Sequence, residues 1–285
     1  MSGEICVQAP AKINLGLRVL PKREDGFHGI ESVFATVGLH DDLLVKPLAE
    51  KNLCRVFCDE AEVPQKNTVN SAYDAALSVL GADLPGVSVQ LKKRVPLGGG
   101  LGGGSSDAAA LLTALQKLGV AFPKGAANKI AALVGSDVFF FLSLDGRPNG
   151  AALVWGRGEM VKPIVPRSDL HYVLIFPGVH SSTAEAYAAI DERPGKTESG
   201  CLSLEELEGV YRSSPEDWTF VNDFTFVIAD KYPKVRQALR DIKESGALFS
   251  DMSGSGSTVF GVFDSAQKAQ DAMSFLAGKW DAALL

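Results

Sequence analysis

The sequence has few of the residues that hold small secreted proteins together or bind structural metal ions. Its 285 residues include 4 cysteines and 4 histidines, too few and too scattered for a disulfide framework or a zinc motif. Cys54 and Cys58 lie in a strand-like stretch with no histidine near them in the sequence. We therefore expect all 4 cysteines to be free thiols and no dedicated transition-metal site.

Long hydrophobic runs and an excess of basic residues are also absent. No apolar run exceeds five residues, whereas a transmembrane helix needs roughly 20. The first residues, MSGEICVQAPAK, lack the apolar segment of a secretory signal. The formal net charge of −6 disfavours binding to nucleic acids or anionic membranes. We therefore expect a cytoplasmic protein without nucleic-acid or membrane partners.

What is present is the composition of a globular protein, with 46% hydrophobic and 22% charged residues. Strand-like and helix-like segments are interleaved without a strict βαβ order, which favours an α+β fold over a doubly wound sheet. Strands are expected at residues 6–20, 30–39, 43–48, 53–58, 87–91, 152–155, 159–165, 171–176 and 258–263. Helices are expected at residues 68–81, 106–119, 123–135, 182–191, 222–246 and 265–278, and an exposed loop at 192–200.

The most informative segment is PLGGGLGGGSSDAAA at residues 96–110, where six glycines fall within seven positions. Glycine lets the backbone approach a ligand closely, and free N–H groups before a helix form an anion site suited to phosphates. We expect residues 105–107 to cap the helix that follows; a flexible surface turn is the alternative interpretation. The basic cluster Lys92–Arg94 just before the loop is typical of a solvated strand end, with attraction of anions as the alternative.

Other phosphate-binding loops fit this segment poorly. A Walker A loop needs a lysine before the serines, and none is present. Gly98–Gly103 satisfies GxGxxG literally, but a polar KKRVP stretch separates strand and loop, and no acidic residue ends a following strand about 20 residues on. A protein kinase would show HRD and DFG motifs, which the sequence lacks.

The loop resembles the central ATP-phosphate loop of the GHMP kinases. Two further signatures of that superfamily stand in the expected order, APAKINLGL at residues 9–17 and MSGSGSTVFGVF at residues 252–263. The N-terminal block at 9–34, GSDVFFF at 135–141 and GRGE at 156–159 resemble the branch that phosphorylates 4-(cytidine 5'-diphospho)-2-C-methyl-D-erythritol to the 2-phosphate in the non-mevalonate isoprenoid pathway. The resemblance implies ATP as phosphoryl donor, Mg²⁺, and a small-molecule acceptor.

The resemblance also implies a two-domain α+β fold with the active site between the domains. Residues 1–160 would form an ATP-binding domain like ribosomal S5 domain 2, and residues 161–285 a ferredoxin-like domain. Lys12 and Asp137 match the catalytic lysine and catalytic base of the family. By themselves, Lys12 suits an edge strand and Asp137 a helix N-terminus.

Further site residues follow from the same resemblance. The residues expected to bind ATP are Pro96, Leu97, Gly98, Gly99, Gly100, Leu101, Gly102, Gly103, Gly104, Ser105 and Ser106. Those expected to bind the cytidine substrate are Asn14, Phe27, His28 and Tyr187, with Phe27 stacking on the base and His28 hydrogen-bonding its edge. Ser105 or Ser106, with Ser106 preferred, is the expected Mg²⁺ ligand, and simple capping is the alternative. For Phe27 the alternative is a core position.

The sequence departs from the pattern of this branch at four positions. Phe27 replaces a usual Tyr, Gly29 a usual Glu, Asp107 a common Asn, and Phe139 a usual Pro. Another GHMP kinase, acting on mevalonate or homoserine, is the nearest alternative. A non-catalytic nucleotide-binding protein and a nicotinamide oxidoreductase are more distant ones. The oligomeric state is left open.

Overall fold

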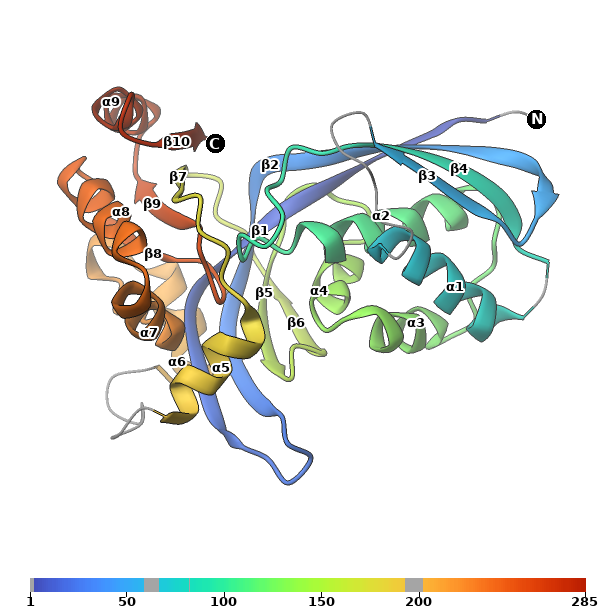
Figure 1. The fold of residues 1–285 in the computed structure, drawn as a ribbon, viewed down its shortest axis with the longest axis horizontal. Coiled ribbons are helices and arrows are strands. Elements are labelled where there is room, and N and C mark those ends of the chain that lie inside the picture. Colours follow the sequence, from blue (N-terminus) through green and yellow to red (C-terminus); the bar gives the residue numbers. More distant parts are fainter. Residues whose placement is uncertain (1–2, 59–66, 82, 193–201) are drawn as a thin grey trace.

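The computed structural model describes residues 3–58, 67–81, 83–192 and 202–285, and the described strands form two sheets, one in each half of the chain (Figure 1). The first half contains β1 (Ile5–Lys22), β2 (His28–Lys51), β3 (Cys54–Cys58), α1 (Thr68–Leu80), β4 (Pro85–Lys92), α2 (Gly103–Lys117), α3 (Ala126–Val134), α4 (Asp137–Ser143), β5 (Ala151–Gly156) and β6 (Met160–Ile164). The second half contains β7 (His171–Phe176), α5 (Thr183–Glu192), α6 (Leu204–Arg212), the short turn η1 (Pro215–Asp217), α7 (Asp223–Lys231), α8 (Pro233–Glu244), β8 (Phe249–Met252), β9 (Val259–Phe263), α9 (Ala266–Leu276) and β10 (Asp281–Leu284).

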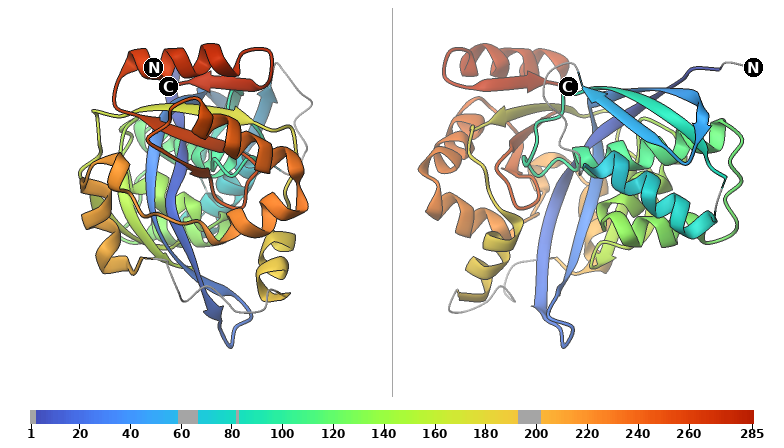
Figure 2. Two further views of the ribbon diagram at one scale, coloured as in Figure 1. Left: turned by 90° about the vertical axis from the view of Figure 1, so that its left-hand side faces the viewer. Right: turned by 45° about the vertical axis from the view of Figure 1, so that its right-hand side comes forward.

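The first sheet is built around the long hairpin of β1 and β2. β1 pairs along one edge of β2, and β4 and β5 share the other edge, which gives the order β3-β4-β2-β5-β6 with β1 alongside. Helices α1 to α4 gather against one face of this sheet (Figures 1 and 2). On the other face, Leu207 and Tyr211 of α6 share a core cluster with Val33 and Leu153.

Because helices cover both faces, β1 is buried through its middle. Ala11, Ile13 and Leu15 join the core cluster on the α6 side. Successive side chains of a strand point to opposite faces, so Lys12 and Asn14 face the other way, toward the helices of the first half. Both are buried. The fold therefore buries two polar side chains in the first half. Burial of polar groups costs free energy unless they are hydrogen-bonded, so Lys12 and Asn14 are candidates for a functional role.

The second sheet has the ferredoxin-like arrangement. Its strands and helices follow the order β7, helices, β8, β9, α9, β10, and the spatial order of the strands is β10-β7-β9-β8 with every pair antiparallel. The expected α+β class and the ferredoxin-like second sheet are thus confirmed. The expected boundary at residue 160 stays a prediction; the first sheet ends at Ile164 and the second begins at His171.

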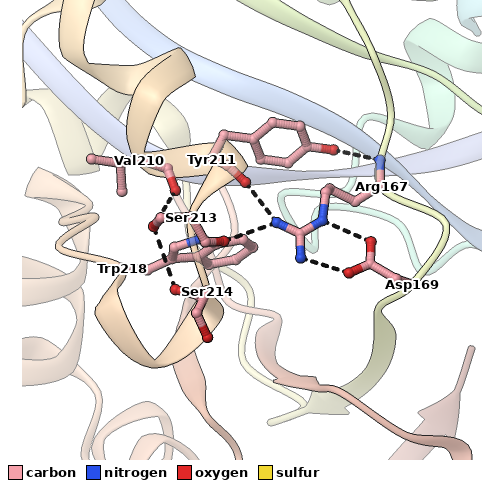
Figure 3. Close-up of polar contacts among 7 residues, drawn as sticks. All are labelled: Arg167, Asp169, Val210, Tyr211, Ser213, Ser214 and Trp218. Atoms are coloured by element: carbon pink, nitrogen blue, oxygen red, sulfur yellow. Dashed lines mark hydrogen bonds and ion pairs between the residues drawn. The ribbon is translucent and has the colours of Figure 1, made fainter.

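A polar cluster joins the segment between the two sheets to α6 (Figure 3). Arg167 donates to both carboxylate oxygens of Asp169 at 2.7 and 2.6 Å. It also donates to the backbone carbonyls of Tyr211 and Ser213 at 3.0 and 2.9 Å, at the end of α6. These bonds fix α6 against the connection between the halves.

Several expected boundaries were wrong. Residues 30–39 and 43–48 belong to the single strand β2, because the polar residues between them keep their pairing with β1. The expected helix at 222–246 is two helices, since Pro233 cannot donate a backbone hydrogen bond and starts α8 instead. The helix expected from residue 123 begins at Ala126. α6, β8 and β10 were not predicted, although the sequence SLEE at 203–206 forms a capping box that marks the start of α6.

The expected cap of α2 was also wrong. The helix begins at Gly103 and its N-cap is Gly102, with φ of 71° and no side-chain cap bond. The last glycines of the loop form the first helical turn, so Ser105, Ser106 and Asp107 lie inside the helix.

Among the other expectations, Cys6, Cys54 and Cys58 are free thiols, and Cys201 lies outside the described residues. The expected loop after Glu192 lies outside them as well. In the described part of the chain, no helix combines the length and the apolar character that a membrane crossing needs.

Candidate active site

A cleft of about 970 Å³ is lined by residues from both halves of the chain. Its volume suits a small-molecule site. The described residues that line it include Lys12, Asn14, Phe27, His28, residues 96–105, Asp137 and Tyr187, which are all the expected site residues except Ser106. Expected site residues that lie up to 175 positions apart in the sequence are therefore brought together around one cavity.

Lys12 lies on the floor of the cleft and is 4% exposed. Its ammonium group donates to Asn14 Oδ1 at 2.6 Å, lies 3.5 Å from Asp137 Oδ2, and sits 4.7 Å from the centre of the Phe34 ring. Burial lowers the pKa of Lys12, while Asp137 opposes this by favouring the charged form. The register with β2 shifts between Pro10 and Lys12. At this bulge the Lys12 N–H turns to Leu101 O at 2.9 Å.

Asp137 is the first residue of α4. This confirms the prediction that it stands at a helix N-terminus. Its side chain is 30% exposed, so one part of the carboxylate contacts Lys12 and another faces the cavity. The arrangement can accept a proton or orient a hydroxyl group that enters the cleft.

The glycine loop is held from both halves of the chain. Gly98, Gly100 and Gly102 have positive φ, which side-chain-bearing residues rarely adopt. A Cβ on Gly100 would lie 2.1 Å from the Ser253 carbonyl oxygen, so only glycine fits there. Ser253 Oγ donates to Gly100 O at 2.9 Å, and Thr258 N donates to Gly99 O at 3.2 Å. The loop is therefore an ordered cradle, and the alternative of a flexible surface turn is wrong.

Residues 253–257, here called the C-terminal glycine loop, owe their position to a buried network. Asn222 donates to the carbonyls of Met252 and Gly254 at 2.7 and 2.8 Å. Asp251 accepts from Thr225 Oγ1 at 2.5 Å, from Met252 N at 2.7 Å and from Asn222 N at 3.1 Å. Burial raises the pKa of Asp251 to about 7, which these hydrogen bonds oppose. This network explains how the sequence MSGSGS becomes a wall of the cleft.

Another part of the cleft lining is aromatic. Phe27 is 51% exposed, which excludes the alternative of a core position, and the Arg157 guanidinium lies 3.8 Å from the centre of its ring. His28 stacks on Tyr187 with ring centres 5.2 Å apart and planes 18° apart. Its ring nitrogens lie 2.8 Å from Leu20 O and 3.4 Å from Asp191 Oδ2. The expected contact of His28 with a cytosine stays a prediction.

Ser106 does not line the cleft, whereas its neighbour Ser105 does. The Ser106 hydroxyl is buried and has no hydrogen-bond partner within the described part of the chain. Across that same part, no group of three His, Cys, Asp or Glu side chains could hold a metal ion. Mg²⁺ commonly takes one or two protein ligands and otherwise binds water and substrate phosphates. The Asp137 carboxylate and the Ser105 hydroxyl, which both line the cleft, fit such an ion, whereas the buried Ser106 hydroxyl does not reach the cavity surface.

Sequence reasoning missed several lining residues. Arg157 belongs to the GRGE tetrapeptide, which served as a family signature without a role. Lys22 and Asp191 pair at 3.6 Å beside His28. Thr183, at the start of α5, shares a hydrogen bond of 2.9 Å with Ser255. No local pattern marks these last residues, because their partners lie far away in the sequence.

Comparisons with known proteins agree with this geometry. The family model for the GHMP kinases N terminal domain matches residues 33–143, and that for GHMP kinases C terminal matches residues 204–282. A protein of Treponema pallidum (strain Nichols) named 4-diphosphocytidyl-2-C-methyl-D-erythritol kinase is 36% identical over 284 residues, which covers 97% of this chain and 96% of that protein. A protein of the same name from Chlorobium luteolum is 36% identical and covers 94% of this chain and 92% of its own length.

Solved structures give the same result. A crystal structure of a 4-(cytidine 5'-diphospho)-2C-methyl-D-erythritol kinase matches with a TM-score of 0.81 at 32% identity and covers 98% of both chains. The mevalonate kinase of Methanococcus jannaschii matches with a TM-score of 0.66 at 14% identity, covering 99% of this chain and 97% of that one. The second match shows a shared fold and nothing more.

Proposed function

Because this chain belongs to the 4-diphosphocytidyl-2-C-methyl-D-erythritol kinase family of the GHMP kinases, we propose that it transfers a phosphoryl group from ATP to the 2-hydroxyl of 4-(cytidine 5'-diphospho)-2-C-methyl-D-erythritol, a step toward isoprenoid precursors. The chain is a small-molecule kinase with ATP as its donor. The observation that carries the proposal is the Lys12–Asp137 pair on the floor of a cleft lined by the glycine loop.

The glycine loop and the start of α2 bind the phosphates of ATP. Backbone N–H groups of the loop and the positive end of the helix dipole favour a polyanion at this point. The missing Cβ atoms let the phosphate oxygens approach the backbone. Asp137 and Ser105, which both line the cleft, would hold Mg²⁺, and the ion would supply further positive charge on the phosphate oxygens. In this way the cradle replaces the lysine of a Walker loop, which the sequence lacks.

Lys12 stabilises the charge that spreads over the transferred group. Phosphoryl transfer passes through a loose transition state, so positioning and electrostatics supply most of the acceleration. The Lys12 ammonium is buried and fixed by Asn14 at 2.6 Å. A cation that is already oriented in a water-poor site needs little reorganisation as the reaction proceeds.

Asp137 orients the acceptor hydroxyl and takes its proton. The carboxylate lines the cavity at the start of α4, and its Oδ2 lies 3.5 Å from the Lys12 ammonium group. The cytidine lies against the aromatic part of the lining, where Phe27 offers an exposed ring face and Tyr187 a second aromatic surface. The same cleft thus offers aromatic surface for the base and the Lys12–Asp137 pair for the reacting hydroxyl group.

A side-by-side kinase assay tests the proposal. The purified protein is offered ATP and Mg²⁺ with the cytidine diphosphate substrate, with mevalonate or with homoserine, and ADP release and product mass are followed. We expect turnover with the first acceptor and background ADP release with the others. Turnover of mevalonate or homoserine in preference to the cytidine substrate contradicts the proposed acceptor.

Two variants connect that activity to this cleft. Lys12→Ala removes the ammonium group on the floor of the cleft and should abolish most turnover. Asp145→Asn, an exposed carboxylate after α4 that does not line the cleft, is the control and should keep wild-type turnover.

A further inference from the structure

Three charged side chains behind the glycine loop form a cluster that does not touch the cleft. Lys93 Nζ donates to Asp41 Oδ2 at 2.5 Å and to Asp107 Oδ2 at 2.9 Å. Asp41 is fully buried and Asp107 nearly so, while 16% of the Lys93 side chain is exposed. None of the three is among the described residues that line the cavity. From the sequence, Lys92–Arg94 was interpreted as a solvated strand end. For Lys93 that interpretation was therefore wrong.

The three residues join the two flanks of the loop. Lys93 lies just before residues 96–104, and Asp107 lies in the first turns of α2, just after them. Asp41 comes from the middle of β2, and its Oδ1 accepts the N–H groups of Arg94 and Val95 at 2.5 and 2.8 Å. One carboxylate thus fixes the entry to the loop, and one ammonium group ties that entry to its exit.

A loop with six glycines needs such anchors. Glycine loses more conformational freedom on ordering than any other residue, so a free loop would adopt many shapes. Phosphate binding requires one shape, with the N–H groups aimed inward. Lys93 is also close to the loop itself, since a Cβ on Gly103 would lie 3.4 Å from its Nζ.

We propose that Lys93, Asp41 and Asp107 act as positioning residues, a clamp that presets the glycine loop for the phosphates of ATP without contacting either substrate. The proposal rests on the proposed function, because it assigns ATP to this loop. It also gives a role to Asp107, where this chain departs from the Asn common in its branch: the side chain is an acceptor for the Lys93 ammonium, as an Asn oxygen could also be.

The test uses the full-length protein and measures binding of a non-hydrolysable ATP analogue by calorimetry, together with KM for ATP and for the cytidine substrate. Lys93→Met should raise the Kd for the analogue and the KM for ATP about tenfold, and leave KM for the cytidine substrate within about twofold. Lys92→Met, an exposed neighbour, is the matched control and should behave as wild type.

The outcomes separate a clamp on the phosphate loop from a general effect on the fold. Wild-type affinity for the analogue in folded Lys93→Met overturns the clamp alone, and so does a parallel rise in both KM values. A wild-type protein that does not bind the analogue overturns the proposed function together with the clamp.

A second pair of variants covers the case in which Lys93→Met does not fold. Asp107→Leu leaves the Lys93–Asp41 pair intact but removes the acceptor on α2. Asp107→Asn keeps an acceptor oxygen. We expect about tenfold weaker analogue binding for the Leu variant and less than about threefold for the Asn variant. Equal binding by the two variants overturns the proposal.

Discussion

The cleft lining has two parts that are built differently. The phosphate end is here the glycine loop with Lys12 and Asp137, and the aromatic end is Phe27, His28 and Tyr187. At the phosphate end, Lys12 is 4% exposed and bonded to Asn14, and both flanks of the glycine loop are tied to buried groups. At the aromatic end, Phe27 is 51% exposed, and its contact with Arg157 joins two side chains that both line the cavity. One end is fixed before any ligand arrives, and the other keeps open surface for a ligand to cover.

This difference follows from what each end has to do. Stabilising the charge of a transition state requires groups that are already oriented, because reorganising them during the reaction would raise the barrier. Stacking on a base requires a large apolar face that water can leave. Substitutions of Lys12 and Asp137 should therefore lower kcat, and those of the aromatic lining residues should raise the KM of the cytidine substrate.

The largest effects are expected at the phosphate end. Lys12→Ala and Asp137→Asn should each leave a folded protein and lower kcat about a hundredfold or more, because one supplies charge and the other orients the hydroxyl. Steady-state kinetics with circular dichroism as a check on folding measure this. A variant that keeps more than about a tenth of the wild-type kcat contradicts the role given to that residue.

A smaller, more selective effect is expected for His28. Its ring stacks on Tyr187 and contacts Asp191, so it connects the β1–β2 hairpin with α5 at the aromatic end. His28→Ala should raise KM for the cytidine substrate about tenfold and leave KM for ATP nearly unchanged. Equal increases in both KM values would remove the distinction between the two ends.

The sequence was most informative where function depends on local backbone. The glycine loop, Lys12 and Asp137 stand in contiguous motifs, and the structure brings all three to one cavity. It was least informative where partners come from distant segments. His28 and Asp191 are 163 residues apart, and no sequence pattern near either residue predicts their contact. The start of α2 was misplaced because glycine, a poor helix former, takes up the first turn where the backbone must approach a ligand.

Phe27 separates stacking from hydrogen bonding at the aromatic end. Phe27→Ala should weaken binding of the cytidine substrate by about 1 kcal/mol, the lower end of the range for a stacked base, because Arg157 already covers part of the ring. Phe27→Tyr keeps the ring and should be nearly neutral. An exposed ring contributes little to folding, so thermal unfolding should not change. A large loss of stability with unchanged KM would mean that Phe27 serves the fold instead of the substrate.

The remaining expected effect is on stability and not on catalysis. It concerns the network behind the C-terminal glycine loop, where neutral hydrogen-bond donors contact the buried Asp251 carboxyl group. The pKa of Asp251 is raised to about 7 from 3.8 by burial. The native state thus keeps this proton at pH values where the unfolded chain has lost it, so the contribution of Asp251 to stability falls as pH rises from about 4 to about 7.

Asp251→Asn removes that titration. Because an amide has only one acceptor oxygen, the variant also loses at least one of the hydrogen bonds from Asn222 N, Thr225 Oγ1 and Met252 N. Urea unfolding at pH 5.5 and at pH 8 should show the stability of the variant, relative to wild type, improving by about 1–2 kcal/mol at the higher pH. Asp107, whose pKa burial also raises to about 7, keeps its own pH dependence in both proteins, so the difference between them isolates Asp251. Asp230→Asn, an exposed control, should track wild type at both pH values. A constant difference for Asp251→Asn would mean that its carboxyl group is ionised throughout, and that the hydrogen bonds to Asp251 outweigh its burial.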